Sequence, residues 1–198
     1  MAQSITNLDC PGCGAPVSTA EKNCPFCKGP VTISTFNSVA SMPFPEITKY
    51  ANNYSRALST NPTDANICCS AGMCYLKLRL YDKALIAFDN AIANNFDGSE
   101  AYFYAAISML KGLKPFLASR QTIDKALELL SAALMIEPRG IYYYLVAYIK
   151  YDYFSRKYFK ISPDYKETLI MAASVNPSEH DIKQLFEILN VERPVNVM

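Results

Sequence analysis

Several features that would point to a particular class of function are scarce in this sequence. Its 198 residues include no tryptophan, seven glycines and a single histidine, His180. The net charge is +1 at pH 7, so no excess of positive charge predicts binding to nucleic acid or to an anionic membrane. The sequence also has no Gly-rich phosphate loop, no GxSxG motif and only one histidine to serve as a base. These absences favour a protein that is not an enzyme.

Long apolar runs are missing as well. A membrane-spanning helix needs about 18 consecutive apolar residues, and no such stretch is present. The first ten residues lack the basic start and the apolar run of a secretion signal. We therefore expect a cytoplasmic protein without membrane insertion, whose thiols stay reduced. Hydrophobic residues make up 51% of the chain, which is enough to build a core.

The seven cysteines fall into two groups. Four of them form two CxxC pairs with ten residues between the pairs, and they are Cys10, Cys13, Cys24 and Cys27. Zn²⁺ prefers four tetrahedral ligands, and thiolates suit it. The pairs therefore predict one structural Zn²⁺, which must supply the folding free energy of a segment too short to build a core. Four thiolates leave no open position for a reacting water, so we do not expect a catalytic metal.

The residues around the CxxC pairs predict a small β structure. Gly14 and Gly29 follow the two pairs, where we expect glycine to permit positive φ. The β-branched segment 31–35 predicts a strand that completes the ribbon. Over residues 8–35 the pattern CPGCGAPV…KNCPFCKG resembles the short zinc ribbon at the N-terminus of many bacterial proteins. The resemblance implies a structural metal on the four cysteines and no particular activity.

The other three cysteines, Cys68, Cys69 and Cys74, lie in a helical pattern. Their spacing does not match a metal-binding turn, and Cys68 and Cys69 point about 100° apart on a helix. Buried cysteine behaves as a small hydrophobic residue. We therefore expect these three thiols to serve packing.

Beyond residue 45 the sequence repeats with a period near 34 residues. From Ala65, helical periodicity runs to about Arg79 and resumes from Asp82 to about Asn94. Small and aromatic residues stand at fixed positions of this unit, namely Gly72, Tyr75, Tyr81, Ala84, Phe88 and Ala91. This spacing resembles the tetratricopeptide repeat, in which pairs of helices pack as hairpins.

The signature of the second helix recurs along the chain. It is present at Tyr50-Tyr54-Ala57-Pro62, at Ala126-Leu130-Ala133-Pro138 and at Tyr165-Leu169-Ala172-Pro177. First helices are predicted at residues 65–79, 99–113 and 140–158, and a closing helix at 179–190. The predicted fold is mainly α, an α-solenoid of about three and a half hairpins behind a small β ribbon. The predicted domains are a zinc ribbon (1–35), a linker (36–44), a repeat domain (45–192) and a tail (193–198).

The resemblance to the repeat family implies a groove for a protein partner, lined by the first helix of each hairpin. An exposed apolar concave surface is typical of a binding site. The alternative is that the closing helix, or a second copy of the protein, covers this surface. The groove residues are Asn66, Cys69, Met73, Leu76, Lys77, Phe103, Ile107, Leu110, Lys111, Tyr142, Leu145 and Ile149.

Aromatic residues are concentrated late in the chain. Eight of the 14 tyrosines lie between Ile141 and Tyr165. This helix could be a second protein interface, a platform that stacks on single-stranded nucleic acid, or a bulky core between repeats. The candidate interface residues are Tyr151, Tyr153, Phe154, Arg156 and Tyr158.

The combined features favour a non-catalytic adaptor that binds a protein partner through its helical array and uses the ribbon as a docking module. One alternative is a nucleic-acid-associated regulator that uses the ribbon and the helix 141–160. Against it, Lys22 and Lys28 are balanced by Asp9 and Glu21 in the ribbon. A second alternative is an accessory subunit of a larger enzyme complex. The partner, the pathway and the oligomeric state have no signature in the sequence.

Overall fold

The chain forms two compact units, Met1–Asp97 and Gly98–Met198. The computed structural model describes residues 7–33, 35–94 and 97–197. This division differs from the predicted domains, because the ribbon shares a unit with the first helices and the predicted repeat domain is divided. The bounds at residues 35, 45 and 192 stay predictions.

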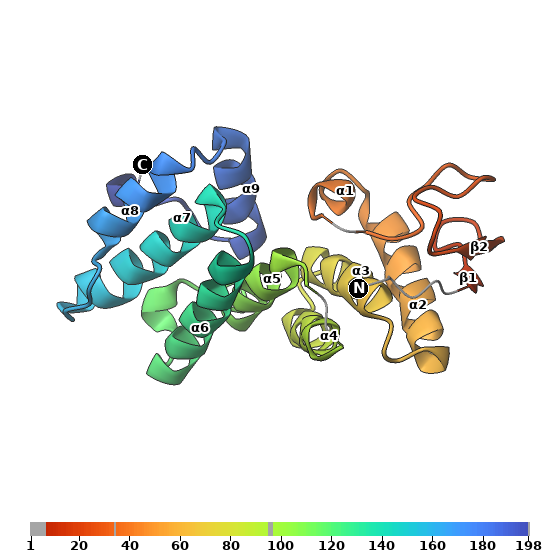
Figure 1. Cartoon of the computed structure of the whole chain (residues 1–198), viewed down its shortest axis with the longest axis horizontal. Coiled ribbons are helices and arrows are strands. Elements are labelled where there is room, and N and C mark those ends of the chain that lie inside the picture. Colours follow the sequence, from red (N-terminus) through yellow and green to blue (C-terminus); the bar gives the residue numbers. More distant parts are fainter. Residues whose placement is uncertain (1–6, 34, 95–96, 198) are drawn as a thin grey trace. The chain divides into compact units, whose positions relative to one another are not determined.

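The first unit contains the ribbon and four helices (Figure 1). Helix α3 packs against both α2 and α4, and the short α1 packs against α3. The elements are β1 (Asn7–Asp9), β2 (Pro16–Ser18), α1 (Asn37–Ala40), α2 (Phe44–Thr60), α3 (Ala65–Lys77) and α4 (Tyr81–Ala93).

The second unit is built from two hairpins and a closing helix. Helix α5 packs against α6, and α7 packs against α6, α8 and α9. Its α-helices are α5 (Ser99–Met109), α6 (Arg120–Ile136), α7 (Gly140–Ile149), α8 (Tyr165–Ser174) and α9 (Glu179–Leu189). Its other helical segments are η1 (Pro115–Leu117), the π turn η2 (Lys150–Phe154), η3 (Ser155–Lys157) and η4 (Val195–Val197).

The fold is mainly α, as predicted, and each predicted helix lies within a few residues of its expected place. Several helices begin where a side chain caps a free backbone N–H. Asp64, Ser119 and Ser178 accept such bonds at α3, α6 and α9, and Asp164 with Glu167 forms a capping box at α8. No helix in the described part of the chain is both long and apolar enough to cross a membrane.

The small residues of the repeat pattern permit close packing within hairpins. A Cβ atom on Gly72 of α3 would lie 2.7 Å from the Phe88 ring of α4. Phe88 is completely buried, so its ring occupies the space that a larger residue at position 72 would need. Both residues stand at fixed positions of the repeat pattern.

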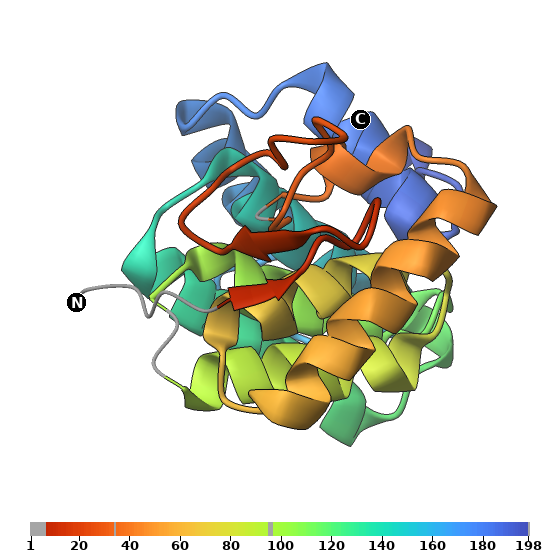
Figure 2. The ribbon, with the colours of Figure 1, turned by 90° about the vertical axis from the view of Figure 1, so that its right-hand side faces the viewer.

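The ribbon sheet differs from the prediction. It consists of β1 and β2, paired antiparallel with Leu8 opposite Val17, and Figure 2 shows these strands in red beside α2 in orange. The strand predicted at 31–35 was wrong for the described residues of that segment, which form bends, while Ser34 lies outside them. Tyr54 Oη donates to Val31 O at 2.9 Å, and Ile33 N donates to Ser70 Oγ at 2.8 Å. Val31 N donates to Lys22 O at 3.0 Å, next to the isolated bridge between Asn23 and Pro30. Val31 and Ile33 are buried, so their β-branched character reflects packing rather than sheet pairing.

The first helix of the third predicted hairpin is long, as expected, but it is not regular. From Gly140 it continues through η2 and η3 and ends at Tyr158, whose φ is 59°. The segment between α5 and α6 includes η1, which packs against η2. There Phe116 N donates to Asp152 Oδ2 at 2.7 Å. This segment therefore supplies a partner for a buried carboxylate.

Candidate metal centre and the groove beside it

The four ribbon cysteines meet at one point. Their Sγ atoms all lie within 4.8 Å of one another. The distance is 3.6 Å from Cys10 to Cys27 and 3.7 Å from Cys13 to Cys24. A disulfide would need about 2.05 Å, whereas metal–sulfur bonds of about 2.3 Å place tetrahedral ligands about 3.8 Å apart. The arrangement therefore fits a tetrahedral ion held by four thiolates.

Backbone turns position the ligands. Gly14 N donates to Cys10 O at 2.9 Å, and Lys28 N donates to Cys24 O at 3.0 Å. Gly14 has a φ of 82°, as expected for the first turn. In the second turn the residue with positive φ is Lys28, at 63°, and not Gly29. The expectation that Gly29 supplies the positive φ of the second turn was therefore wrong.

The two buried ligands differ in acidity. Burial raises the pKa of Cys10 to about 12. The pKa of Cys24 is lowered to about 7: burial opposes ionisation there, but hydrogen bonds from the backbone of Cys27 and Phe26 and from the Cys10 and Cys13 side chains together outweigh it. A bound divalent ion would hold all the thiols as thiolates, because the thiolate is the form that coordinates metal.

Tyr50 of α2 fills the space between the two CxxC turns. It is 1% exposed. A Cβ atom on Gly12 would lie 3.0 Å from Tyr50 Oη, and one on Gly29 would lie 2.5 Å from it. Glycine at both positions therefore makes room for the phenol. Burial and the nearby sulfurs of Cys10 and Cys27 raise the pKa of Tyr50, so its hydroxyl stays protonated.

Further side chains of α2 hold the ribbon. Asn53 Nδ2 donates to Pro11 O at 2.7 Å, and Lys49 Nζ also donates to Gly12 O. With Tyr54, these residues recur every three to four positions, which is one face of a helix. Sequence reasoning noted Tyr50 and Tyr54 only as repeat positions and missed their contact with the ribbon. Two buried tyrosines in a helix without a regular partner helix before it were the available signal.

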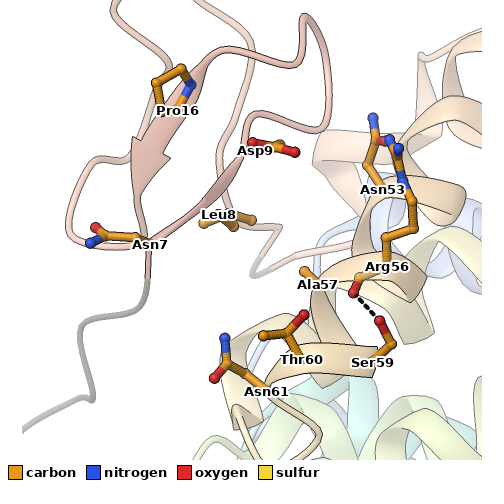
Figure 3. Close-up of a pocket in the computed structure, with 10 residues that line it drawn as sticks. All are labelled: Asn7, Leu8, Asp9, Pro16, Asn53, Arg56, Ala57, Ser59, Thr60 and Asn61. Atoms are coloured by element: carbon orange, nitrogen blue, oxygen red, sulfur yellow. Dashed lines mark hydrogen bonds between the residues drawn. The ribbon is translucent and has the colours of Figure 1, made fainter.

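A groove lies between the ribbon and α2. Its volume is about 530 Å³. Figure 3 shows the Asp9 carboxylate pointing toward Asn53 and Arg56 across it. Arg56 Nη2 donates to Asn53 Oδ1, which fixes the guanidinium along this wall. The lining residues are Asn7, Leu8, Asp9, Pro16, Asn53, Arg56, Ala57, Ser59, Thr60 and Asn61.

The predicted partner-binding residues of α3 lie mostly in the core of the first unit. Cys69, Met73 and Leu76 are each at most 2% exposed, and Asn66 and Lys77 are half-buried. Lys77 Nζ donates to Ala40 O at 2.7 Å, at the end of α1. Ile33 and the short helix α1 therefore pack on this helix, and partner binding there stays a prediction.

The predicted groove residues of the second unit are also buried, except for Lys111. The rings of Phe103 and Tyr142 contact each other, with centroids 4.7 Å apart. The closing helix α9 packs against α7 through contacts of Phe186 with Tyr144 and Tyr148, which are not among the predicted groove residues. Partner binding at these positions stays a prediction. The remaining members, all at most 2% exposed, are Ile107, Leu110, Leu145 and Ile149.

The candidate second interface is divided between core and surface. Tyr153 and Phe154 are at most 5% exposed and belong to the core between helices. Tyr151 is half-buried, with its ring 5.2 Å from that of Tyr165. Arg156 pairs with Asp152 at 2.5 Å. Tyr158 alone among the five residues is almost fully exposed, at 94%.

The other three cysteines are buried, as expected. Burial raises the pKa of Cys68 to about 11 and that of Cys74 to about 12. In the described part of the chain, the four ribbon cysteines are the group whose geometry suits a metal ion.

Comparisons with known proteins leave the family open. No protein-family model matches the chain, and no curated protein matches it. Five solved chains match. One of them, described as MamA MSR-1 C2, is 16% identical over 71% of this chain and 68% of its own length, with a TM-score of 0.44. At that score the likeness carries no argument about fold or function.

Proposed function

We propose that this protein is a non-catalytic, protein-binding scaffold in which a structural Zn²⁺ shapes the ribbon. The ribbon binds an extended segment of a partner along β1, in the groove beside α2. The observation that carries this proposal is the outer edge of β1, which pairs with no strand among the described residues and lines the groove.

The ladder pattern indicates which backbone groups of β1 face outward. Cys10 N donates to Ala15 O at 2.7 Å, which continues the β1–β2 register by one residue. Hydrogen-bonded pairs alternate with non-bonded pairs in an antiparallel ladder. Leu8 therefore bonds with Val17, while Asn7 and Asp9 direct their N–H and C=O groups away from β2. Such an edge can pair with an added strand.

The groove suits a polar extended peptide. Opposite β1, helix α2 presents amide and hydroxyl groups together with the guanidinium of Arg56. Arg56 and Asp9 lie on opposite walls (Figure 3), so a bound peptide can meet a charge of either sign. Main-chain bonds to β1 would supply affinity, and these side chains would supply selectivity.

Zinc is the ion that best fits the donor set. Four cysteine thiolates select a soft or borderline ion, and a closed Cys₄ site is typical of structural zinc. Bound there, the ion supplies folding free energy and leaves no coordination position for a reacting group. Tyr50 and Asn53 then hold the ribbon against α2 and so define the second wall of the groove.

The test uses a proline in the open edge. Asp9→Pro removes an outward N–H donor but leaves the inner ladder to β2 intact, and proline is tolerated at such edge positions. Asp9→Ala is the matched control, because it removes the carboxylate and keeps the N–H. Affinity purification of the zinc-loaded wild type from its native cell, followed by mass spectrometry, defines the retained proteins.

We expect Asp9→Pro to lose a protein that the wild type and Asp9→Ala both retain. Zinc content and circular dichroism must match in all three proteins. Equal retention by Asp9→Pro would refute strand addition at β1.

A further inference from the structure

A second cavity, open to solvent, lies in the second unit and is lined by residues of α6, α7 and α8 and of the loop before α8. Its volume is about 260 Å³. The walls are largely apolar, with Leu127 and Leu134 from α6, Val146 from α7 and Met171 from α8. Met171 is 42% exposed, so the cavity has an opening to solvent beside α8. This volume lies below the roughly 300–1,000 Å³ of drug-sized sites and suits a short ligand.

Lys150 supplies the charged group that lines this cavity. Lys150 is buried, with only 7% of its surface exposed. Nζ donates to Pro163 O at 2.7 Å and to Thr168 Oγ1 at 3.1 Å. An ammonium group has three N–H donors, so one donor remains after these two neutral acceptors. Within residues 7–33, 35–94 and 97–197, Lys150 forms no ion pair.

The surroundings of Lys150 leave its charge poorly compensated. Burial lowers its pKa, and the more distant carboxylates of Asp164 and Glu167 offset this effect only in part. A buried cation without a close counterion costs folding free energy. A ligand that brings a carboxylate to the third N–H would recover part of this cost through a charge-assisted hydrogen bond.

The backbone at Lys150 is also irregular. The π turn of residues 150–154 begins at this residue, and single π turns within helices often mark functional sites. Thr168, which accepts from Lys150, in turn donates to Asp164 O at 2.6 Å. Side chain and backbone together hold the ammonium at one end of an apolar cavity.

We infer that this cavity binds a small apolar monocarboxylate. The carboxylate accepts from Lys150 Nζ, and a short alkyl chain lies against Leu127, Leu134 and Met171. The inference does not depend on the strand-addition proposal, because the two sites lie in different compact units and share no residue.

Calorimetry on the full-length, zinc-loaded protein tests the inference. The probes are hexanoate and octanoate, with the matching alcohols and hexylammonium as comparisons. We expect the alkanoates to bind, and the alcohols and the amine to bind at least about tenfold more weakly, because an alcohol brings no negative charge to Lys150 and an alkylammonium repels it. Equal binding of an alcohol and its alkanoate would overturn the inference.

Two variants separate the ligand site from a general effect on folding. Lys150→Met keeps the length of the side chain and should weaken octanoate binding at least about tenfold, whereas the exposed Lys166→Met should not. Ser131→Leu places extra volume in the cavity from α6 and should also weaken binding while Lys150 is intact. Thermal unfolding verifies that each variant folds.

Unchanged affinity in both Lys150→Met and Ser131→Leu would contradict the site. Tighter binding of N-acetyl-leucyl-leucine than of any alkanoate would also overturn the inference, and would identify the occupant as the C-terminus of an apolar peptide.

Discussion

The ribbon and the second unit differ in what forms their interiors. The ribbon core contains Cys10, Val17, Cys24 and Val31, with Leu8 packed against them. Two of these five residues belong to the four-cysteine cluster that could hold a metal ion, so little apolar area remains to drive folding. The second unit instead buries large rings, among them Tyr142, Tyr148 and Phe154. If the cysteines bind a metal as proposed, coordination stabilises the ribbon, whereas burial of aromatic area stabilises the second unit.

The two regions also use tyrosine in different ways. The hydroxyls of Tyr50 and Tyr54 of α2 contact the ribbon. Tyr50 Oη lies against Gly12 and Gly29, and Tyr54 Oη donates to Val31 O. Tyr142, Tyr144 and Tyr148 of α7 pack against other rings within their unit. The comparison indicates that contacts with α2 support the ribbon in addition to the four-cysteine cluster.

Removal of the metal is expected to have the largest effect. Structural zinc in small domains contributes on the order of 10 kcal/mol or more. Chelation, or the double substitution Cys13→Ser with Cys27→Ser, should unfold residues 7–33 and leave α5–α9 folded. Hydrogen exchange measured by peptide, with metal content from elemental analysis, tests this. Equal loss of protection in both regions would show that the ribbon does not depend on the metal more than the second unit does.

The converse change is Phe186→Ala in α9. Phe186 is 6% exposed and contacts both Tyr144 and Tyr148, so we expect a loss of about 3–5 kcal/mol in the free energy of unfolding of the second unit. Urea unfolding followed by tyrosine fluorescence measures this loss. The metal content should stay the same as in the wild type, and a loss of metal would break the contrast between the regions.

Gly29→Ala sharpens the role of Tyr50. The new Cβ would lie 2.5 Å from Tyr50 Oη, and overpacking of this kind costs about 1–3 kcal/mol. Tyr50→Phe removes the oxygen and should relieve the clash, so a double-mutant cycle on ribbon stability should give a favourable coupling. Additive losses would mean that Tyr50 does not determine the need for glycine at this position.

The smallest expected effect is that of Tyr54→Phe. Its hydroxyl donates to Val31 O within the core, and loss of a buried bond of this kind costs about 1–2 kcal/mol. The ring and the four cysteines remain, so metal content should not change. Thermal unfolding of the metal-loaded protein gives the magnitude, and the exposed Tyr158→Phe is a control without effect.

Features that depend on short spacing were readable from the sequence. The CxxC pairs bring two sulfurs together within one turn, and the four cysteines do meet. Hairpin helices followed from helical periodicity and from small residues such as Gly72. The strand predicted at 31–35 failed because β-branched residues favour burial as well as sheet pairing.

The sequence by itself determined the ligand set, the helices and their pairing, because each rests on contacts between residues close in the chain. Only the tertiary structure decided that Tyr50 occupies the space between the CxxC turns, that the first-helix residues lie in the core, and that Lys150 lines an apolar cavity. These features join residues about 20 to 40 positions apart. No local periodicity encodes such distant contacts, since they depend on how completed helices pack.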